Sequence, residues 1–164
     1  MSISVMTLDL SKWEEVARDA LVLPVFREDR PLRGAAGLVD WRLCGRLSRL
    51  MRSGKASGVA GESLLLPASR RLRFTRILWF GLGEAKGYNE DRARRDLQWI
   101  ARVSAAAGVT DLAMQLPGRS MGLLGARRAV ELLFECPTFD ATAVTIIEDS
   151  SGQKDIADVL RQRS

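Results

Sequence analysis

A short, wholly apolar run lies near the middle of the chain, at residues 77–80 (Ile-Leu-Trp-Phe), between Arg76 and Gly81. Four consecutive apolar residues between a charged residue and a glycine are typical of a strand buried on both faces, in a sheet that helices cover on both sides. Gly81 and Gly83 allow the backbone to turn sharply after this strand. In an open α/β sheet ligands bind beyond the carboxyl ends of the strands, so the pattern predicts a ligand site at this corner first.

The same pattern of apolar and polar positions predicts alternating strands and helices along the whole chain. Further strands are expected at residues 2–8, 20–26, 62–67, 111–116 and 141–147. Helices are expected at residues 11–18, 35–53, 89–107, 120–135 and 151–161. The strands at 62–67 and 77–80 lie close in sequence and predict an antiparallel hairpin. These elements predict an α/β fold with a mixed sheet between helical layers, in a single domain spanning residues 1–164.

Individual residues predict where some of these elements begin or end. Ser11 stands three residues before Glu14, the spacing of a capping box, and so predicts a helix start. Asn89, followed by two acidic residues, predicts the start of the helix at 89–107. Pro24 lacks a backbone N–H, which predicts a break or a sheet edge near the end of its strand.

Arginines recur in two groups. In the helix expected at 35–53, apolar residues form one face, and arginines recur at the same steps on another face, at Arg42, Arg46, Arg49 and Arg52. The hairpin turn expected at residues 68–73 carries the second group, Arg70, Arg71 and Arg73. A solvated charged face is one interpretation of these residues, and a surface for phosphate, nucleic acid or a protein partner is the other.

Composition narrows the possible functions. The net charge is +5, and only four of the 25 basic residues are lysines. An arginine-rich chain is suited to phosphate or nucleic acid, although a coding bias towards arginine gives the same composition. The chain has no histidine, which excludes Ser-His and Cys-His nucleophiles, histidine-based zinc sites and imidazole acid–base catalysis. Cys44 and Cys136 lie far apart, and both are expected to be small buried apolar residues.

Other familiar signals are weak or missing. The glycines at 54–61 do not have the spacing of a P-loop, and Gly81-x-Gly83 with Gly87 is one residue longer than the dinucleotide fingerprint. No apolar run approaches the roughly 20 residues that cross a bilayer. The first ten residues have no basic lead before an apolar segment. We therefore expect no signal peptide, no membrane partner and a cytoplasmic location.

Several of these segments, in their order and spacing, resemble the N-terminal domain of the leucyl aminopeptidases, the family of two-metal peptidases known as M17. The matching segments are residues 47–54, 61–67 and 76–83, and residues 129–131 with 138–140. The resemblance covers about residues 18–147. It implies a macro-domain-like three-layer α/β/α sandwich. In the full-length family this domain precedes a separate catalytic domain and helps to build a hexamer.

The resemblance implies no catalytic residue here. The two divalent metals of the family, zinc or manganese, belong to the catalytic domain, and a two-metal site needs clustered carboxylates. The acidic residues of this chain are scattered, so we expect no catalytic residue, no metal ligand and no cofactor, and we lean away from an enzyme. The leading expectation is a non-catalytic domain that acts by self-association or by binding a protein or regulatory partner.

Two alternatives remain. Nucleic acid is the first, bound through the two arginine groups. The second is ADP-ribose or another nucleotide derivative, because residues 37–45 resemble the segment in which macro domains hold a nucleotide diphosphate at a helix start. Residues 23–26 (Leu-Pro-Val-Phe) replace the asparagine-rich motif of macro domains. The candidate ligand residues are Asp40 and the backbone of Gly81, Leu82 and Gly83, with helix-end N–H groups facing phosphate.

Overall fold

The computed structural model describes residues 1–15, 17–140 and 142–164. Its centre is a six-stranded sheet with the strand order β1-β6-β5-β2-β4-β3. Only β3 runs antiparallel, and it pairs with β4 as the expected hairpin. The sheet is therefore mixed, as the sequence predicts. The strands are β1 (Ser2–Thr7), β2 (Arg18–Phe26), β3 (Ser63–Pro67), β4 (Phe74–Gly83), β5 (Asp111–Met114) and β6 (Ala143–Glu148).

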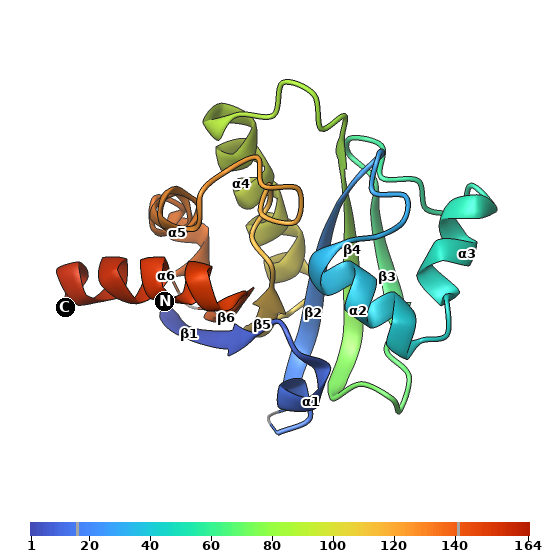
Figure 1. Cartoon of the computed structure of the whole chain (residues 1–164), viewed down its shortest axis with the longest axis horizontal. Coiled ribbons are helices and arrows are strands. Elements are labelled where there is room, and N and C mark those ends of the chain that lie inside the picture. The colour runs from blue at the N-terminus through green and yellow to red at the C-terminus, as the bar shows by residue number, and fades with distance from the viewer. Residues whose placement is uncertain (16, 141) are drawn as a thin grey trace.

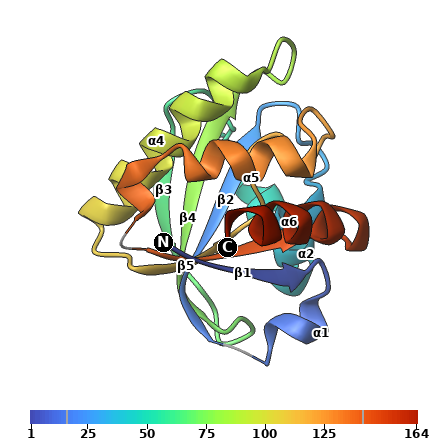
Figure 2. The ribbon, with the colours of Figure 1, turned by 90° about the vertical axis from the view of Figure 1, so that its left-hand side faces the viewer.

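Helices cover both faces of the sheet (Figures 1 and 2). One face carries α4 (Glu90–Ala106), α5 (Ala126–Phe134) and α6 (Ser150–Arg163), with the 3-10 helix η1 (Pro137–Phe139) before β6. The opposite face carries α1 (Leu10–Trp13), α2 (Gly34–Arg42) and α3 (Arg46–Arg52). This arrangement is the three-layer α/β/α sandwich that the resemblance implies. Among the described residues, no helix combines the length and apolar character that crossing a membrane requires.

Strand β4 confirms the prediction of a strand buried on both faces. Leu78 and Phe80 enter the core beneath α4 and α5, whereas Ile77 and Trp79 enter the core beneath α2 and α3. Alternate side chains of a strand point to opposite faces, so an unbroken apolar run supplies both cores at once. The strand is longer than expected because its ends pair with β2 as far as Phe74 and Gly83.

The prediction of a single helix at residues 35–53 is wrong. The chain forms α2 and α3, separated by a turn in which Cys44 and Gly45 have φ values of 57° and 81°. The carboxylate of Asp40 accepts hydrogen bonds from the backbone N–H and the hydroxyl of Ser48. It thereby satisfies a free N–H in the first turn of α3 and favours a new helix start. The apolar positions survive the break because both helices pack on the same core.

Other boundaries differ for local reasons. The N-cap of α1 is Asp9, not Ser11, because the Asp9 carboxylate accepts from the N–H of Ser11 at 3.0 Å. The helix expected from residue 120 begins only at residue 126, since residues 120–125 form turns with Gly122 at a positive φ of 66°. Asn89 is confirmed as the N-cap of α4, accepting from the N–H of Arg92 at 3.0 Å. The start expected for the last strand, Ala141, lies outside the described residues.

Pro24 does not mark an edge of the sheet, because β2 lies between β5 and β4. Strand β5 pairs with β2 only from Ala20 to Val22, so Pro24 has a paired neighbour on the β4 side alone. A residue without a backbone N–H is tolerated there because one side of the strand no longer needs that donor. The register with β4 then shifts between Val25 and Phe26, where the sequence predicts a break.

Candidate functional site

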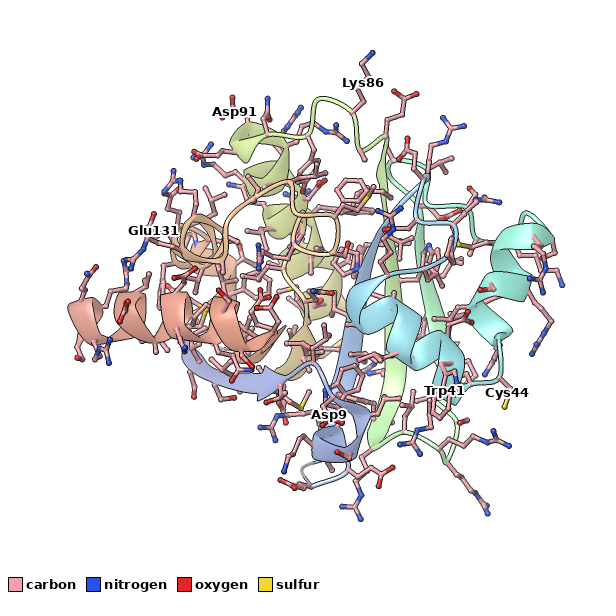
Figure 3. All side chains as sticks on the ribbon, viewed as in Figure 1. Asp9, Trp41, Cys44, Lys86, Asp91 and Glu131 are labelled. Atoms are coloured by element: carbon pink, nitrogen blue, oxygen red, sulfur yellow. The ribbon has the colours of Figure 1, made fainter. Side chains whose placement is uncertain are left out.

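A large open hollow lies beside Trp41 at the end of α2. It has a volume of about 950 Å³ and is called the Trp41 hollow here. Its walls come from the loop after β2, from α2 and the turn that follows it, and from the β3–β4 hairpin turn. The lining residues are Pro31, Leu32, Gly37, Asp40, Trp41, Arg42, Cys44, Gly45 and Arg71. Trp41 is 75% exposed, so its indole is available for contact. Figure 3 shows Trp41 and Cys44 together at the edge of the molecule.

Contacts across this hollow bring the two arginine groups together. Arg71 in the hairpin turn donates to Sγ of Cys44 at 2.7 Å, and Arg46 in α3 donates to the carbonyl of Pro67 at 3.3 Å. The hairpin turn is thus held against the turn between α2 and α3. Cys44 is exposed there, contrary to the expectation that it is buried, whereas Cys136 is buried as predicted.

The arginines differ in how far the protein itself occupies them. Arg42 pairs with Glu14 at 2.6 Å, and Arg49 donates to the carbonyl of Cys44 at 2.7 Å. The remaining members of the two groups are exposed at the surface: Arg52, Arg70 and Arg73. The two arginine groups therefore combine side chains that the protein holds in place with side chains that face solvent, and Arg42 and Arg71 line the Trp41 hollow.

The structure does not join Asp40 to the glycine corner. Asp40 lines the Trp41 hollow, while Leu82 lines a different hollow beside α4. In Figure 3, Trp41, the residue after Asp40, lies far below Lys86, which belongs to the loop after the glycines. The Asp40 carboxylate is already engaged with Ser48. The predicted ligand residues therefore do not form one site.

The glycine corner is filled by the protein's own backbone. Gly81, Leu82 and Gly83 are buried. The N–H of Gly81 donates to the carbonyl of Glu62 at 2.7 Å, and the N–H of Gly83 donates to the carbonyl of Gly58 at 2.8 Å. A side chain at position 81 would lie 2.0 Å from the carbonyl oxygen of Val59. Glycine is needed at position 81 for this close packing, and the amides of Gly81 and Gly83 are not free for a phosphate.

The crevice between the ends of β2 and β5 is also closed, by a residue that the sequence did not single out. Oε1 of Gln115 accepts a hydrogen bond from the N–H of Ala35 at 2.9 Å, at the start of α2. The space that remains there is about 10 Å³, roughly the room for one water molecule. Strand order reverses at this point, where α/β folds commonly bind ligands. No local signal marks Gln115, because its partner lies 80 residues away.

A second unpredicted group lies at the end of β6. Glu148 is buried and receives two hydrogen bonds from the guanidinium of Arg119, at 2.8 and 3.0 Å. The same arginine donates to the carbonyl of Leu124 at 2.8 Å, so the pair fixes the loop between β5 and α5. The Glu148 carboxylate raises the pKa of Arg119 through these hydrogen bonds. In the described part of the chain, no group of three or more His, Cys, Asp or Glu side chains is placed to hold a metal ion.

Comparison with known sequences identifies relatives. Residues 22–135 match the family model described as "Cytosol aminopeptidase family, N-terminal domain". The probable cytosol aminopeptidase of Halorhodospira halophila is 36% identical over 100 residues, which are 61% of this chain and 20% of that protein. The corresponding protein of Burkholderia multivorans is 30% identical over 151 residues, which are 87% of this chain and 30% of that protein. The chain therefore spans less than a third of the length of either relative.

Solved structures show the same fold at low sequence identity. A mutant tomato leucine aminopeptidase has a TM-score of 0.63 and 16% identity, with the match covering 96% of this chain and 35% of that one. A Trypanosoma brucei macrodomain in complex with ADP-ribose has a TM-score of 0.72 and 14% identity, covering 96% of this chain and 68% of that one. The family match extends over more than half of the sequence. This chain therefore belongs to the cytosol aminopeptidase family, matches its N-terminal domain and has a macrodomain-like fold.

Proposed function

We propose that this domain is non-catalytic and binds a protein partner, with the Trp41 hollow as the contact surface. The observation that carries the proposal is the 75% exposure of Trp41 in a hollow of about 950 Å³. Tryptophan is enriched among the residues that dominate protein interfaces, and an exposed tryptophan beside apolar walls is a strong contact point. Pro31 and Leu32 supply such walls here.

Charge indicates the chemistry of the partner. Arg42 and Arg71 line the hollow, and Arg52, Arg70 and Arg73 are exposed on the segments around it. Packing this surface against the same surface of a second copy would bring like charges together, which costs free energy. An acidic segment with an apolar side chain for the hollow fits better. Association with a second copy is the other form of the same proposal, and it requires a different surface on at least one copy.

Affinity capture with mass spectrometry and light scattering test this proposal. Trp41→Ser is compared with Leu123→Ser, which removes an apolar side chain that is 36% exposed in the loop before α5. We expect the wild type and Leu123→Ser to retain the same acidic partner, and Trp41→Ser to bind the purified partner at least tenfold more weakly. Equal retention by both variants would overturn the role of Trp41. A monomer that retains no partner would overturn the binding function.

Nucleic acid is a second candidate, favoured by the contact between Arg71 and Cys44, which holds the arginine-bearing hairpin turn against the turn between α2 and α3, beside an exposed indole. Such combinations bind single-stranded nucleic acid, through positive charge along its backbone and stacking of its bases on aromatic rings.

Fluorescence anisotropy with a labelled single strand of nucleic acid, from low to high salt, tests this candidate function. The double variant Arg70→Gln, Arg73→Gln should weaken binding and lower the salt slope by about two. The control Lys154→Gln, Arg161→Gln changes the same charge on α6 and should bind as the wild type does; no binding at low salt would refute the candidate.

The ADP-ribose held by the Trypanosoma brucei macrodomain is not carried over to this chain. The crevice beside the start of α2 offers about 10 Å³ and is occupied by the Gln115 side chain. The amides of Gly81 and Gly83 already have acceptors within the protein. These contacts argue for a domain that keeps the macrodomain-like scaffold and uses another surface.

A further inference from the structure

A second hollow, of about 410 Å³, lies on the face of the sheet opposite the Trp41 hollow, and is called the α4 hollow here. Helix α4 passes over the β3–β4 side of the sheet (Figure 2). Ala60, Gly61 and Leu82 form one side of this hollow. Helix α4 forms the other side with Asp96 and with four larger side chains, which are Arg92, Arg95, Trp99 and Arg102. Leu82 is the only predicted ligand residue at this hollow, and it contributes as part of the wall.

The three arginines and Trp99 lie on the same face of α4. They follow at steps of three, four and three, and residues so spaced lie above one another on the same face of a helix. Three guanidinium groups and one indole therefore face one hollow. The only carboxylate on its wall belongs to Asp96. Asp96 accepts a hydrogen bond from the hydroxyl of Tyr88 at 2.9 Å, and burial raises the pKa of Asp96. One carboxylate thus stands against three guanidinium groups at this hollow.

The arginines of α4 fall into two kinds. Arg94, on another side of the helix, pairs with Asp91 at 2.9 Å and with Glu135 at 3.1 Å. Arg92 donates to the carbonyl of Leu82 at the end of β4 at 2.9 Å, and to the carbonyl of Lys86 in the loop after β4 at 3.4 Å. Within the described residues, Arg95 and Arg102 make no hydrogen bond or ion pair with the protein, and both are exposed. The α4 hollow thus presents hydrogen-bond donors that lack acceptors, which is the complement of an anion.

The geometry also provides a flat surface beside the charges. The Trp99 ring packs edge-on against Phe80, with the ring centroids 5.0 Å apart, and remains partly exposed. Arg95 and Trp99 are one helical turn apart, so one ligand can contact both. Guanidinium groups bind phosphate oxygens in pairs, and a tryptophan face stacks on a nucleobase. We propose that the α4 hollow binds a nucleoside phosphate, with Arg95 and Arg102 holding the phosphate and Trp99 contacting the base.

The proposal is independent of partner binding at the Trp41 hollow, because no residue lines both hollows. Its test uses nuclear magnetic resonance of the indole N–H groups in the full chain, with AMP, inorganic phosphate and adenosine as separate probes. The signal of Trp99 is identified by its loss in Trp99→Phe. We expect AMP to shift this signal at lower concentration than phosphate or adenosine does. A Trp99 signal that does not move with millimolar AMP would overturn the proposal, and equal affinity for phosphate and AMP would overturn the contact with the base.

Charge-matched variants separate this site from general attraction to a basic protein. Arg95→Gln, Arg102→Gln removes two charges from the α4 hollow, while Arg52→Gln, Arg73→Gln removes two exposed charges on other segments. We expect the first pair to weaken AMP binding at least tenfold, since hydrogen bonds to charged groups are lost. The second pair should bind as the wild type does, and an unchanged Trp79 signal shows that both variants are folded. Equal binding by the two double variants would refute the assignment.

Discussion

Oε1 of Gln115 accepts a hydrogen bond from the backbone N–H of Ala35 at 2.9 Å. This bond joins the end of β5 to the first turn of α2, whose N-cap residue, Arg33, has no side-chain capping bond. Gln115 therefore serves as a cap supplied from a distant part of the chain. It also fills the crevice between the ends of β2 and β5, at the kind of position where α/β sheets commonly bind ligands.

Replacing Gln115 with alanine should destabilise the domain. The variant leaves the buried N–H of Ala35 without its acceptor, and losses of this kind cost about 1–2 kcal/mol. Urea denaturation followed by circular dichroism measures the free energy of unfolding. Gln98→Ala is the matched control, since Gln98 is exposed on α4 and its loss should change the free energy by no more than about 0.5 kcal/mol. Equal losses in the two variants would contradict a capping role for Gln115.

Gly34→Ala should destabilise the domain by placing a methyl group against the Gln115 side chain. Gly34 has a φ of 58°, and a Cβ there would lie 2.1 Å from Oε1 of Gln115. The substitution therefore combines backbone strain with a clash, and we expect it to cost about 2 kcal/mol or more in the wild type. In the Gln115→Ala background the clash is gone and only about 1 kcal/mol of strain should remain. A double-mutant cycle from four denaturation curves tests this, and strictly additive costs would show that the clash is absent.

Glu62 should make stability depend on pH in the acid range. Burial raises the pKa of Glu62, but hydrogen bonds from Gly58, Trp79 and Ser57 outweigh burial and hold it below the usual 4.5. Because the folded pKa is the lower one, the stabilisation is complete above about pH 4.5 and is lost as the pH falls through the folded value. The free energy of unfolding, measured from pH 3 to pH 7, should fall less steeply with acid in Glu62→Gln. The exposed control Glu15→Gln should follow the wild-type curve, and a Glu62→Gln curve parallel to the wild type would rule this out.

Breaking the buried ion pair of Arg119 and Glu148 should be the most damaging of these changes. The Glu148 side chain is 2% exposed, and Arg119→Met would leave its carboxylate buried without a counter-charge. Removing one partner of such a pair costs about 3–5 kcal/mol. The control Arg161→Met breaks an ion pair with Asp158 in which Arg161 is 75% exposed, and should cost no more than about 1 kcal/mol. Thermal unfolding of both variants distinguishes these costs, and similar small shifts would show that Glu148 finds another partner.

Local chemistry explains which predictions the structure confirms. The apolar run at residues 77–80 is a strand buried on both faces, and Asn89 is the N-cap of α4. Both predictions are correct because the alternation of side chains along a strand and the capping of a helix depend on residues only a few positions apart. The helix expected at 35–53 failed for the opposite reason. Its apolar spacing is continuous across Cys44 and Gly45, so the spacing hides a turn that the structure shows in the positive φ values of these two residues and in the bond from Ser48 back to Asp40.

The sequence by itself determined the order of most strands and helices, the burial of β4 on both faces and the resemblance to the aminopeptidase N-terminal domain. Each of these depends on residues close in sequence or on the order of short segments. The tertiary structure alone decided which surfaces are open. Gln115 meets Ala35 across 80 residues and closes one crevice, while Arg71 meets Cys44 across 27 residues and builds one wall of the Trp41 hollow. Such contacts form between side chains brought together by the packing of distant elements, and no spacing along the chain encodes them.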